Sequence, residues 1–471
     1  MSMERRNAAA RAARASGIIV LMALTCTDAR PEPARAGARA EDAAAPRTLV
    51  AEVSDSKALG YVGNRKFLID SRGTMYCAVR GCGPRFTGIC LLRSTKHWPE
   101  ADGFDSAWLE DRPGVEVSSA PQRAASIALG GDGSIHLVWY GGTALAPAHQ
   151  IRYARFAAGG APRLLEESEP FPVAGFERVY LGPLTGDELW QEHPCIASTP
   201  DGRVQLVWEA RDPSRLNAQG GPQPGIAAAV RDTAGNWSAS GPLAAPPYLQ
   251  VDAHFPSQSR PTLAAGPGGA LHVICYGSVG GVQQILRGVL RDGTFSGWSV
   301  VAPSPGDQRH VSAACEASGR VHIAWREGPV SGAGAGPIAV YYASLDPEGR
   351  VAGPVRVSPA GENASTPSVV ANGTSVWVAW VAWTPGELNS EGRRDNGYPA
   401  DNAAVEGRLE IRSARSGTSS FGPVTQLEAG PVSYPTWASR TDQARAPEAL
   451  IWTRIEQGSK YRLMLTPVAG R

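Results

Sequence analysis

A sequence unit that recurs seven times limits what this chain can fold into. Each copy is a short apolar strand, a turn that usually contains glycine and a second apolar strand that ends on tryptophan in most copies. The copies lie at 66–79, 126–139, 195–208, 262–275, 312–325, 368–380 and 436–452. Asp132-Gly133 and Asp201-Gly202 supply residues that tolerate the positive φ of tight hairpins. The chain is therefore predicted to be built from repeated β-hairpins.

A third strand follows most copies, as at 151–156, 338–343 and 409–413, and further turns with glycine and often tryptophan come after it. Equivalent positions of successive copies lie 50 to 72 residues apart. Four strands per repeat without helical periodicity predict an all-β fold, a β-propeller of seven four-stranded blades. Six blades plus an extra hairpin is the alternative. The 54 glycines and 38 prolines then form turns and strand starts, and the 13 tryptophans fill space between blades.

The two ends of the repeat region indicate how the ring closes. The last copy lacks a fourth strand, and the strand-like residues 48–53 precede the first copy without a partner of their own. Pairing these residues with the last blade removes both free sheet edges. We therefore expect residues 48–471 to form one propeller domain that is closed by its N-terminal strand.

The N-terminal residues have the composition of an export signal. Four arginines precede an apolar run at 17–24, which is too short for the roughly 20 residues that span a bilayer. Cys26 follows this run and resembles the lipid-bearing cysteine of bacterial lipoproteins. We predict an export signal at 1–26, with lipidation of Cys26 and release as open alternatives, and a disordered Ala/Pro/Arg-rich tether at 27–47. The protein is then periplasmic, an outer-membrane lipoprotein or extracellular.

The charge balance limits the partners. Lys and Arg number 45 and Asp and Glu 44, for a net charge of +1, which argues against nucleic acid and against an anionic membrane surface. Contact with a membrane is expected only through a lipid on Cys26, and the protein is expected to be a monomer. No nucleophile elbow, phosphate loop or His-Glu zinc motif occurs, so we predict no cofactor.

Six further cysteines are candidate disulfide partners and candidate metal ligands. An even number in an exported protein permits disulfides, and Cys77 could face Cys90 across one hairpin. Their spacing fits no zinc template, so a structural role is favoured and no metal is predicted. The six are Cys77, Cys82, Cys90, Cys195, Cys275 and Cys315.

Repetition separates structural residues from functional ones. His136, His272 and His322 occupy one equivalent place on the second strand of three copies, with Gln205 in a fourth. A residue type that returns at one repeat position serves the repeat. These histidines are therefore predicted to pack and to form a hydrogen bond rather than to bind a ligand.

The residue pairs that precede the first strand of each copy are more diverse. In a propeller these positions surround the mouth of the central channel. Polar strand ends at a wet mouth are one interpretation; the other is a site for an anionic ligand, since guanidinium groups form paired hydrogen bonds to carboxylates. The pairs are Asn64-Arg65, Arg123-Ala124, Glu192-His193, Ser259-Arg260, Arg309-His310, Ser365-Thr366 and Ser433-Tyr434.

Across roughly residues 60–465 the chain resembles the sialidase (neuraminidase) superfamily, in its repeat and in turns such as Asp232…Gly235…Trp237 that are similar to the family's Asp-box. Sialidases have six blades. The resemblance implies that Tyr434, activated by Glu192, attacks the sugar and that Asp105 (or Asp102) protonates the leaving oxygen. It also implies that Arg65, Arg260 and Arg309 hold the sugar carboxylate.

Two other functions fit the same residues. A polysaccharide lyase would use His193 or His310 as base and Tyr434 as acid, with arginine neutralising a uronate. A non-catalytic propeller would bind a glycan or a surface protein, because this fold carries many functions. The sequence thus predicts an acidic-carbohydrate site at the channel mouth with binding residues Arg65, Arg123, His193, Arg260, Arg309 and His310, and leaves open whether it is catalytic.

Overall fold

The computed structural model describes residues 47–54, 56–81, 88–98, 104–108, 123–141, 150–157, 163–168, 191–216, 220–239, 249–250, 254–330, 337–384, 407–440, 449–456 and 460–468. Cys26, Asp102, the export signal and nearly all of the tether lie outside these ranges. Residues 45–471 form one compact unit. Within the described ranges, none of the helical structure is long and apolar enough to cross a membrane.

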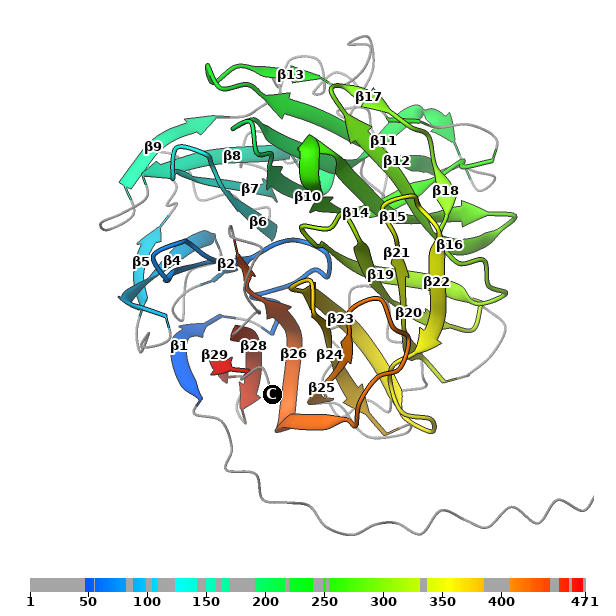
Figure 1. Ribbon diagram of the computed structural model, residues 1–471. Helices are drawn as coiled ribbons and strands as arrows, with labels where there is room; N and C mark the ends of the chain where they lie inside the picture. The colour runs from blue at the N-terminus through cyan, green and yellow to red at the C-terminus, as the bar shows by residue number, and fades with distance from the viewer. Residues whose placement is uncertain are drawn as a thin grey trace, which may run out of the picture. The chain divides into compact units, whose positions relative to one another are not determined.

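The fold is all-β, with a single 3-10 turn at Pro267–Gly269 among the described residues. Figure 1 shows small sheets that follow one another in chain order, and neighbouring strands are antiparallel apart from the β2–β27 pair. The first sheet has the order β27 (Ser439–Arg440), β2 (Phe67–Ile69), β3 (Thr74–Arg80), β4 (Ile89–His97) and β5 (Phe104–Trp108). The second has β6 (Arg123–Leu129), β7 (Ile135–Gly141), β8 (Gln150–Ala157) and β9 (Arg163–Ser168).

The next three sheets repeat this pattern. The third contains β10 (Gln191–Ser198), β11 (Val204–Leu216), β12 (Pro222–Arg231) and β13 (Trp237–Ala239). The fourth contains β14 (Gln258–Ala265), β15 (Leu271–Val279), β16 (Val282–Arg291), β17 (Thr294–Phe295) and β18 (Ser299–Val300). The fifth contains β19 (Asp307–Cys315), β20 (Val321–Gly328), β21 (Ala339–Leu345) and β22 (Val351–Arg356).

The last sheet has seven strands because one long strand, β26 (Thr425–Trp437), pairs with β25 (Gly407–Arg415) along its first part and with β28 (Ala449–Glu456) along its last part. Its other members are β23 (Asn363–Ala371), β24 (Ser375–Trp383), β29 (Lys460–Pro467) and β1 (Thr48–Val53). The N-terminal strand β1 pairs antiparallel with β29, the last strand of the chain.

Most of the repeated hairpin turns have one geometry. In five of the described turns, the amide of the residue before the turn donates to a carbonyl four residues later, as from Gly130 to Ser134 (2.7 Å) and from Thr199 to Arg203 (2.9 Å); Asn372 instead donates to Ser375, three residues later. Gly133 and Gly202 have φ of +78° and +82° in these turns, a conformation that costs little only for glycine. The predicted role of the Asp-Gly pairs is confirmed.

The apolar core is divided among clusters that lie between neighbouring sheets. Trp208, for example, packs with Val138 and Tyr140 of the second sheet, and Trp325 packs with Ile274 of the fourth. Both strand faces are covered, which explains the apolar runs without alternation. Each of seven clusters contains one of the equivalent positions of the repeat, namely Val79, Trp139, Trp208, Cys275, Trp325, Trp380 and Trp452.

The repeated histidines have the predicted structural role. His136 Nδ1 lies 2.8 Å from the hydroxyl of Tyr153, and His322 Nδ1 lies 2.7 Å from that of Tyr342. Each tyrosine belongs to the third strand of the same sheet, so the bond ties the second strand to the third. His272 accepts instead from an arginine of β16.

The five cysteines in the described ranges are buried free thiols. The expected facing of Cys77 and Cys90 is wrong by two residues: Cys90 is opposite Val79, and Cys77 is opposite Leu92. Cys77 and Cys90 therefore lie diagonally on one face, where both belong to the same apolar cluster. Cys82 lies outside the described residues.

Candidate functional site

Six of the first strands carry the same irregularity where they begin. In each, the pairing with the second strand shifts register, as between Glu192 and Cys195 of β10. The second residue of each predicted mouth pair sits in this bulge with positive φ, between 47° and 53°, which is uncommon for residues other than glycine. Since the set contains alanine and threonine, the bulge belongs to the fold. Its members are Ala124, His193, Arg260, His310, Thr366 and Tyr434.

Three consecutive bulges carry groups that can act on a ligand. His193, Arg260 and His310 come from β10, β14 and β19, whose starts lie next to one another. The group is completed by residues at the starts of β6 and β10, on the second strands β7 and β11, and in the segment before β2. We call the following set the mouth site: Tyr61, Arg123, Tyr140, Glu192, His193, Glu209, Arg260 and His310.

His193 and Glu209 form a buried hydrogen-bonded pair at the centre of the mouth site. His193 Nδ1 lies 3.2 Å from Glu209 Oε2, and both residues are less than 5% exposed. Burial on its own raises the pKa of Glu209, but the hydrogen bond from His193 and the charges of His193, Arg211 and Arg260 outweigh it and hold this pKa at about 2. The carboxylate accepts from Nδ1–H, which leaves Nε2 as the imidazole nitrogen that can meet a ligand.

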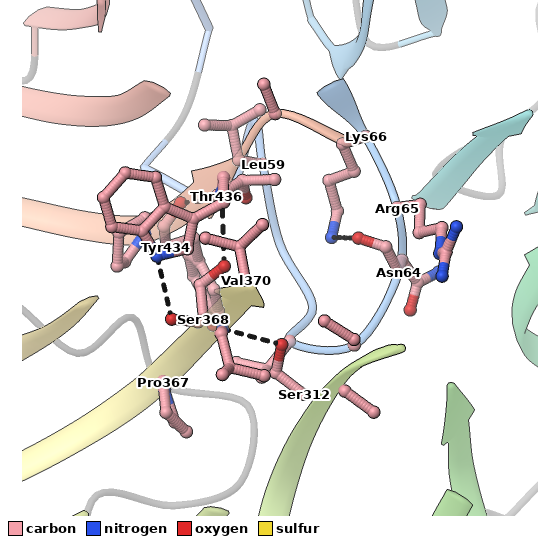
Figure 2. Close-up of a pocket in the computed structure, with 18 of the residues that line it drawn as sticks. Leu59, Asn64, Arg65, Lys66, Ser312, Pro367, Ser368, Val370, Tyr434 and Thr436 are labelled. Carbon is pink, nitrogen blue, oxygen red and sulfur yellow. Dashed lines mark hydrogen bonds between the residues drawn. The ribbon is translucent and has the colours of Figure 1, made fainter. Parts of the chain in front are cut away.

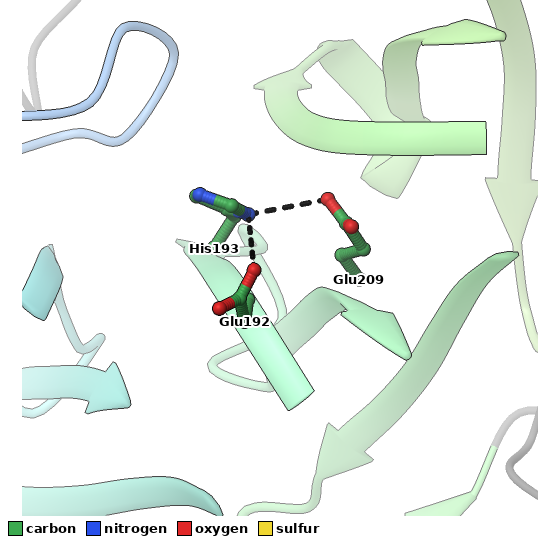
Figure 3. Close-up of side chains that lie close together, drawn as sticks. All are labelled: Glu192, His193 and Glu209. Carbon is green, nitrogen blue, oxygen red and sulfur yellow. Dashed lines mark hydrogen bonds and ion pairs between the residues drawn. The ribbon is translucent and has the colours of Figure 1, made fainter. Parts of the chain in front are cut away.

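Glu192 brings a second carboxylate near the same nitrogen (Figure 3): its Oε2 lies 3.8 Å from His193 Nδ1. One imidazole nitrogen and two carboxylates could in principle hold a metal ion. However, Glu209 Oε2 already accepts from the Arg260 amide at 3.1 Å. A metal-bound histidine usually bonds through its other nitrogen as well, whereas Nε2 of His193 has no hydrogen-bond partner within the described residues. The geometry fits a hydrogen-bonded pair better than a metal centre.

The guanidinium of Arg260 is held by a hydrogen bond to His310. Its Nη1 donates to His310 Nε2 at 3.0 Å, and its Cζ lies 5.4 Å from the centre of the Tyr61 ring. Burial and then the charges of Arg326, Arg260 and Arg309 keep the pKa of His310 well below its ordinary value. His310 is therefore a neutral acceptor that orients Arg260.

Aromatic rings flank His193. The rings of Tyr61 and Tyr140 stand edge-on to the imidazole, with centres 4.5 Å and 5.6 Å away. Burial, together with Tyr61 and Glu192, raises the pKa of Tyr140 well above its ordinary value. Arg123, at the start of β6, hydrogen-bonds to both phenols.

Tyr61 belongs to residues 56–66, which we call the central segment. Asn64 Nδ2 donates to the carbonyls of Ala124 (2.9 Å) and Pro194 (2.7 Å) on two neighbouring first strands. The Gly63 carbonyl accepts from Thr262 Oγ1 at 2.7 Å, and a Cβ on Gly63 (φ +94°) would lie only 2.8 Å from the Val311 carbonyl. The central segment thus fits closely among the first strands of the sheets.

A cavity of about 90 Å³ remains beside the central segment (Figure 2). Its walls are the segment itself and the first strands β19, β23 and β26, with Ser312, Pro367 and Tyr434 among the lining residues. This cavity is large enough for a few water molecules but too small for a sugar chain. It is therefore not the predicted glycan site.

Lys66 ends the central segment as a buried cation without a carboxylate partner in the described residues. Its Nζ donates to the carbonyls of Tyr61 and, at 3.1 Å, of Asn64. Burial lowers the pKa of Lys66 to about 7, an effect that the nearby Cys195 and Cys77 thiols oppose. Lys66 thereby fixes the backbone that presents Tyr61 to His193.

Replacing Asn64 by alanine is expected to destabilise the fold by about 2 kcal/mol, because the buried carbonyls of Ala124 and Pro194 both lose a donor. Urea denaturation measures the change. Asn236→Ala, in an exposed turn, is the control and should change stability by less than about 0.5 kcal/mol. Equal stability of the Asn64 variant and the wild type would show that the segment does not tie these strands together.

The structure distributes the remaining predicted residues over several places. Arg65 belongs to the central segment, donates from Nε to the Leu263 carbonyl at 3.2 Å, and points away from Tyr434 in Figure 2. Arg309 forms an ion pair with Asp307 at 3.3 Å. Asp105 lies in β5, the edge strand of its sheet, rather than in a loop as expected, and its side chain lies outside the described set.

Tyr434 shares a cluster with Leu59 and Phe67, whereas His193 contacts Tyr61, Tyr140 and two glutamates. Tyr434 also lines the cavity beside the central segment, together with Tyr61.

Sequence reasoning missed Tyr61, Tyr140 and Glu209. Glu209 and Tyr140 directly follow the repeated tryptophan of their copies, and they lie opposite Glu192 and Arg123 in the strand register. This position, unlike the tryptophan before it, varies in type between copies. That variability could have marked Tyr140 and Glu209 as candidate functional residues. No such signal exists for Tyr61, since it lies outside the repeat.

No family model matches this chain, and no curated protein sequence matches it. Several solved structures are similar. An ulvan lyase of family PL25, bound to -[GlcA(1-4)Rha3S]-, has a TM-score of 0.55 and 12% identity, and the match covers 88% of this chain and 94% of that one. A Hadza microbial sialidase, Hz136, has a TM-score of 0.44 and 11% identity, covering 83% and 73%.

An α-L-arabinanase of Penicillium chrysogenum, complexed with arabinobiose, has a TM-score of 0.43 and 11% identity, covering 74% of this chain and 93% of that one. The likeness to the ulvan lyase shows a shared fold. The predicted all-β, propeller-type architecture is confirmed at this level.

Proposed function

We propose that the domain is a seven-bladed propeller closed by β1. Support comes from the seven apolar clusters and from the contacts between first strands, which run from β2 through β6, β10, β14, β19 and β23 to β26. The parallel pairing of β27 with β2 then links the last copy to the first. In this arrangement β26 serves two blades, and β1 is the outer strand of the last one.

We infer that the mouth site binds an acidic glycan and cleaves it by β-elimination beside a uronate carboxylate. The observation that carries this proposal is His193, with Glu209 behind its Nδ1 and with Tyr61, whose ring lies under the Arg260 guanidinium, edge-on beside it. A carboxylate on Arg260 would place the acidic carbon of the sugar near Nε2. Neutralising that carboxylate lowers the cost of removing the proton next to it.

The reaction balances with the groups of the mouth site. His193 Nε2 takes the C5 proton, the electrons of that bond form the C4–C5 double bond, and the C4–O bond breaks. The leaving oxygen takes a proton from the Tyr61 phenol, whose ring is closer to His193 than that of Tyr140. Both protons later exchange with water, and no water is added to the sugar. Since His193 is only 4% exposed, the ligand must displace part of the Tyr61 contact to reach it.

We favour elimination over a sialidase mechanism because the pair His193 and Glu209, beside Tyr61 and Arg260, supplies a base, an acid and a cation for a uronate carboxylate. The ulvan lyase that shares the fold is bound to a glycan containing GlcA, an acidic sugar. We further propose, from the sequence, that the protein is exported, through a signal at 1–26 with Cys26 as the possible lipid site, and that it acts as a monomer.

Purified protein should release unsaturated products, measured by ultraviolet absorbance, from glucuronate or galacturonate polysaccharides and nothing from a sialoside. Tyr434→Phe should keep this activity, because Tyr434 has no part in the elimination. Three results would contradict the proposal: sialic acid release that Tyr434→Phe abolishes, new reducing ends without absorbance, which means hydrolysis, or binding without cleavage, which means a binding module.

A further inference from the structure

Two arginines of the mouth site, Arg260 and Arg123, contact Tyr61 in different ways. The Arg260 guanidinium lies over the Tyr61 ring, with 5.4 Å from Cζ to the ring centre. Arg123 instead hydrogen-bonds to the hydroxyl end of the same residue and to Tyr140. The two cations therefore contact different parts of the Tyr61 side chain.

The charge of Arg123 lacks a counter-ion in the described residues. Its partners are two phenols, which are neutral, and no described carboxylate forms an ion pair with it. Other arginines nearby differ: Arg309 pairs with Asp307, and Arg211 pairs with Glu209 at 3.4 Å. Arg123 is partly exposed while its Nε is buried without a hydrogen-bond partner. A partly exposed guanidinium of this kind can form charge-assisted hydrogen bonds to an anionic ligand.

The Tyr61 side chain thus has one arginine at its ring face and another at its hydroxyl. A carboxylate against Arg260 would lie on the ring face, on the part of Tyr61 that also contacts His193. A second anionic group, carried by a neighbouring sugar, would reach Arg123. This differs from the three-arginine clamp on one carboxylate that the sialidase resemblance implied.

We propose that the mouth site has two anion-binding positions, Arg260 and Arg123, and takes a glycan with acidic groups on two neighbouring sugar units. The proposal rests on the proposed acidic-glycan function and adds its substrate class: a polyanion rather than a chain with one terminal acid.

Titration calorimetry with galacturonic acid and with digalacturonate tests this, in the His193→Gln background to prevent cleavage. The dimer should bind about tenfold more tightly than the monomer, the effect of one further charge-assisted contact. Arg123→Gln should lower dimer affinity to the monomer level and leave monomer affinity unchanged. Arg123→Lys should restore part of the difference. Arg350→Gln, in an exposed turn, should change neither affinity.

Thermal denaturation confirms that each variant is folded. Equal loss of monomer and dimer binding in Arg123→Gln, or no loss of either, overturns the two-position proposal alone. If the parent protein binds neither galacturonate nor any acidic polysaccharide, the proposed function itself is wrong.

Discussion

His193→Gln is expected to lower the rate of uronate-polysaccharide cleavage by about 10³-fold, because glutamine cannot take a proton from carbon. Affinity for the polysaccharide should change little, since Arg260 and Arg123 remain. The measurement is the initial rate of absorbance increase, with binding followed separately. His97→Gln, at an exposed position of β4, is the matched control and should keep full activity.

Glu209→Gln separates a positioning role from a purely structural one. A neutral amide can donate to Nδ1 as well as accept from it, so the tautomer of His193 is no longer fixed. We expect a loss of about 10²-fold in kcat with a smaller change in KM, and a shift of the pH profile. A folded Glu209→Gln variant with a wild-type profile would remove this pair from the mechanism, as would full activity of His193→Gln.

Wild-type stability is expected to rise by roughly 2 kcal/mol between pH 7 and pH 9, because of Lys66. Burial lowers the pKa of Lys66 from 10.5 to about 7 in the folded protein. Between these values the unfolded chain holds a proton that the folded protein has released, so raising the pH favours folding. Below pH 7 both states are protonated and the contribution of Lys66 becomes constant.

Lys66→Met should remove this slope, and urea denaturation at pH 7, 8 and 9 measures it. Above pH 9 the buried thiols act in the opposite direction: burial raises the pKa of Cys315 to about 11, so only the unfolded chain loses this proton. Lys460→Met, at an exposed position, should leave the slope intact. An unchanged slope in Lys66→Met would mean that another group titrates.

The sequence was sufficient for features that return in every copy. Strand, turn and tryptophan positions repeat because each sheet must make the same hairpin and fill the same space against its neighbour. The structural role of His136 and His322 followed from that repetition. The Cys77–Cys90 register did not, because the pairing of β3 with β4 is not a feature that the repeat determines.

For the site residues too, the sequence was sufficient only for what the repeat determines. The mouth pairs were found by aligning the copies, because the bulge places the same position of each first strand at one end of its sheet. Which of these residues work together could not be found that way. His193 depends on Glu209 from the second strand and on Tyr61 from outside the repeat. Arg65 instead donates to Leu263 of β14, and Tyr434 packs in a cluster with Leu59.

By itself, then, the sequence determined the repeated β architecture, its core and the repeat position at which the first strands bulge. Local hydrophobic pattern and turn chemistry are sufficient for this, because each repeat is a local unit. Only the tertiary structure decided the partners within the mouth site. Residues 56–66 pass among strands that lie up to several hundred positions away in the chain, and long-range packing, which no local pattern encodes, joined Tyr61 to His193 and Arg260.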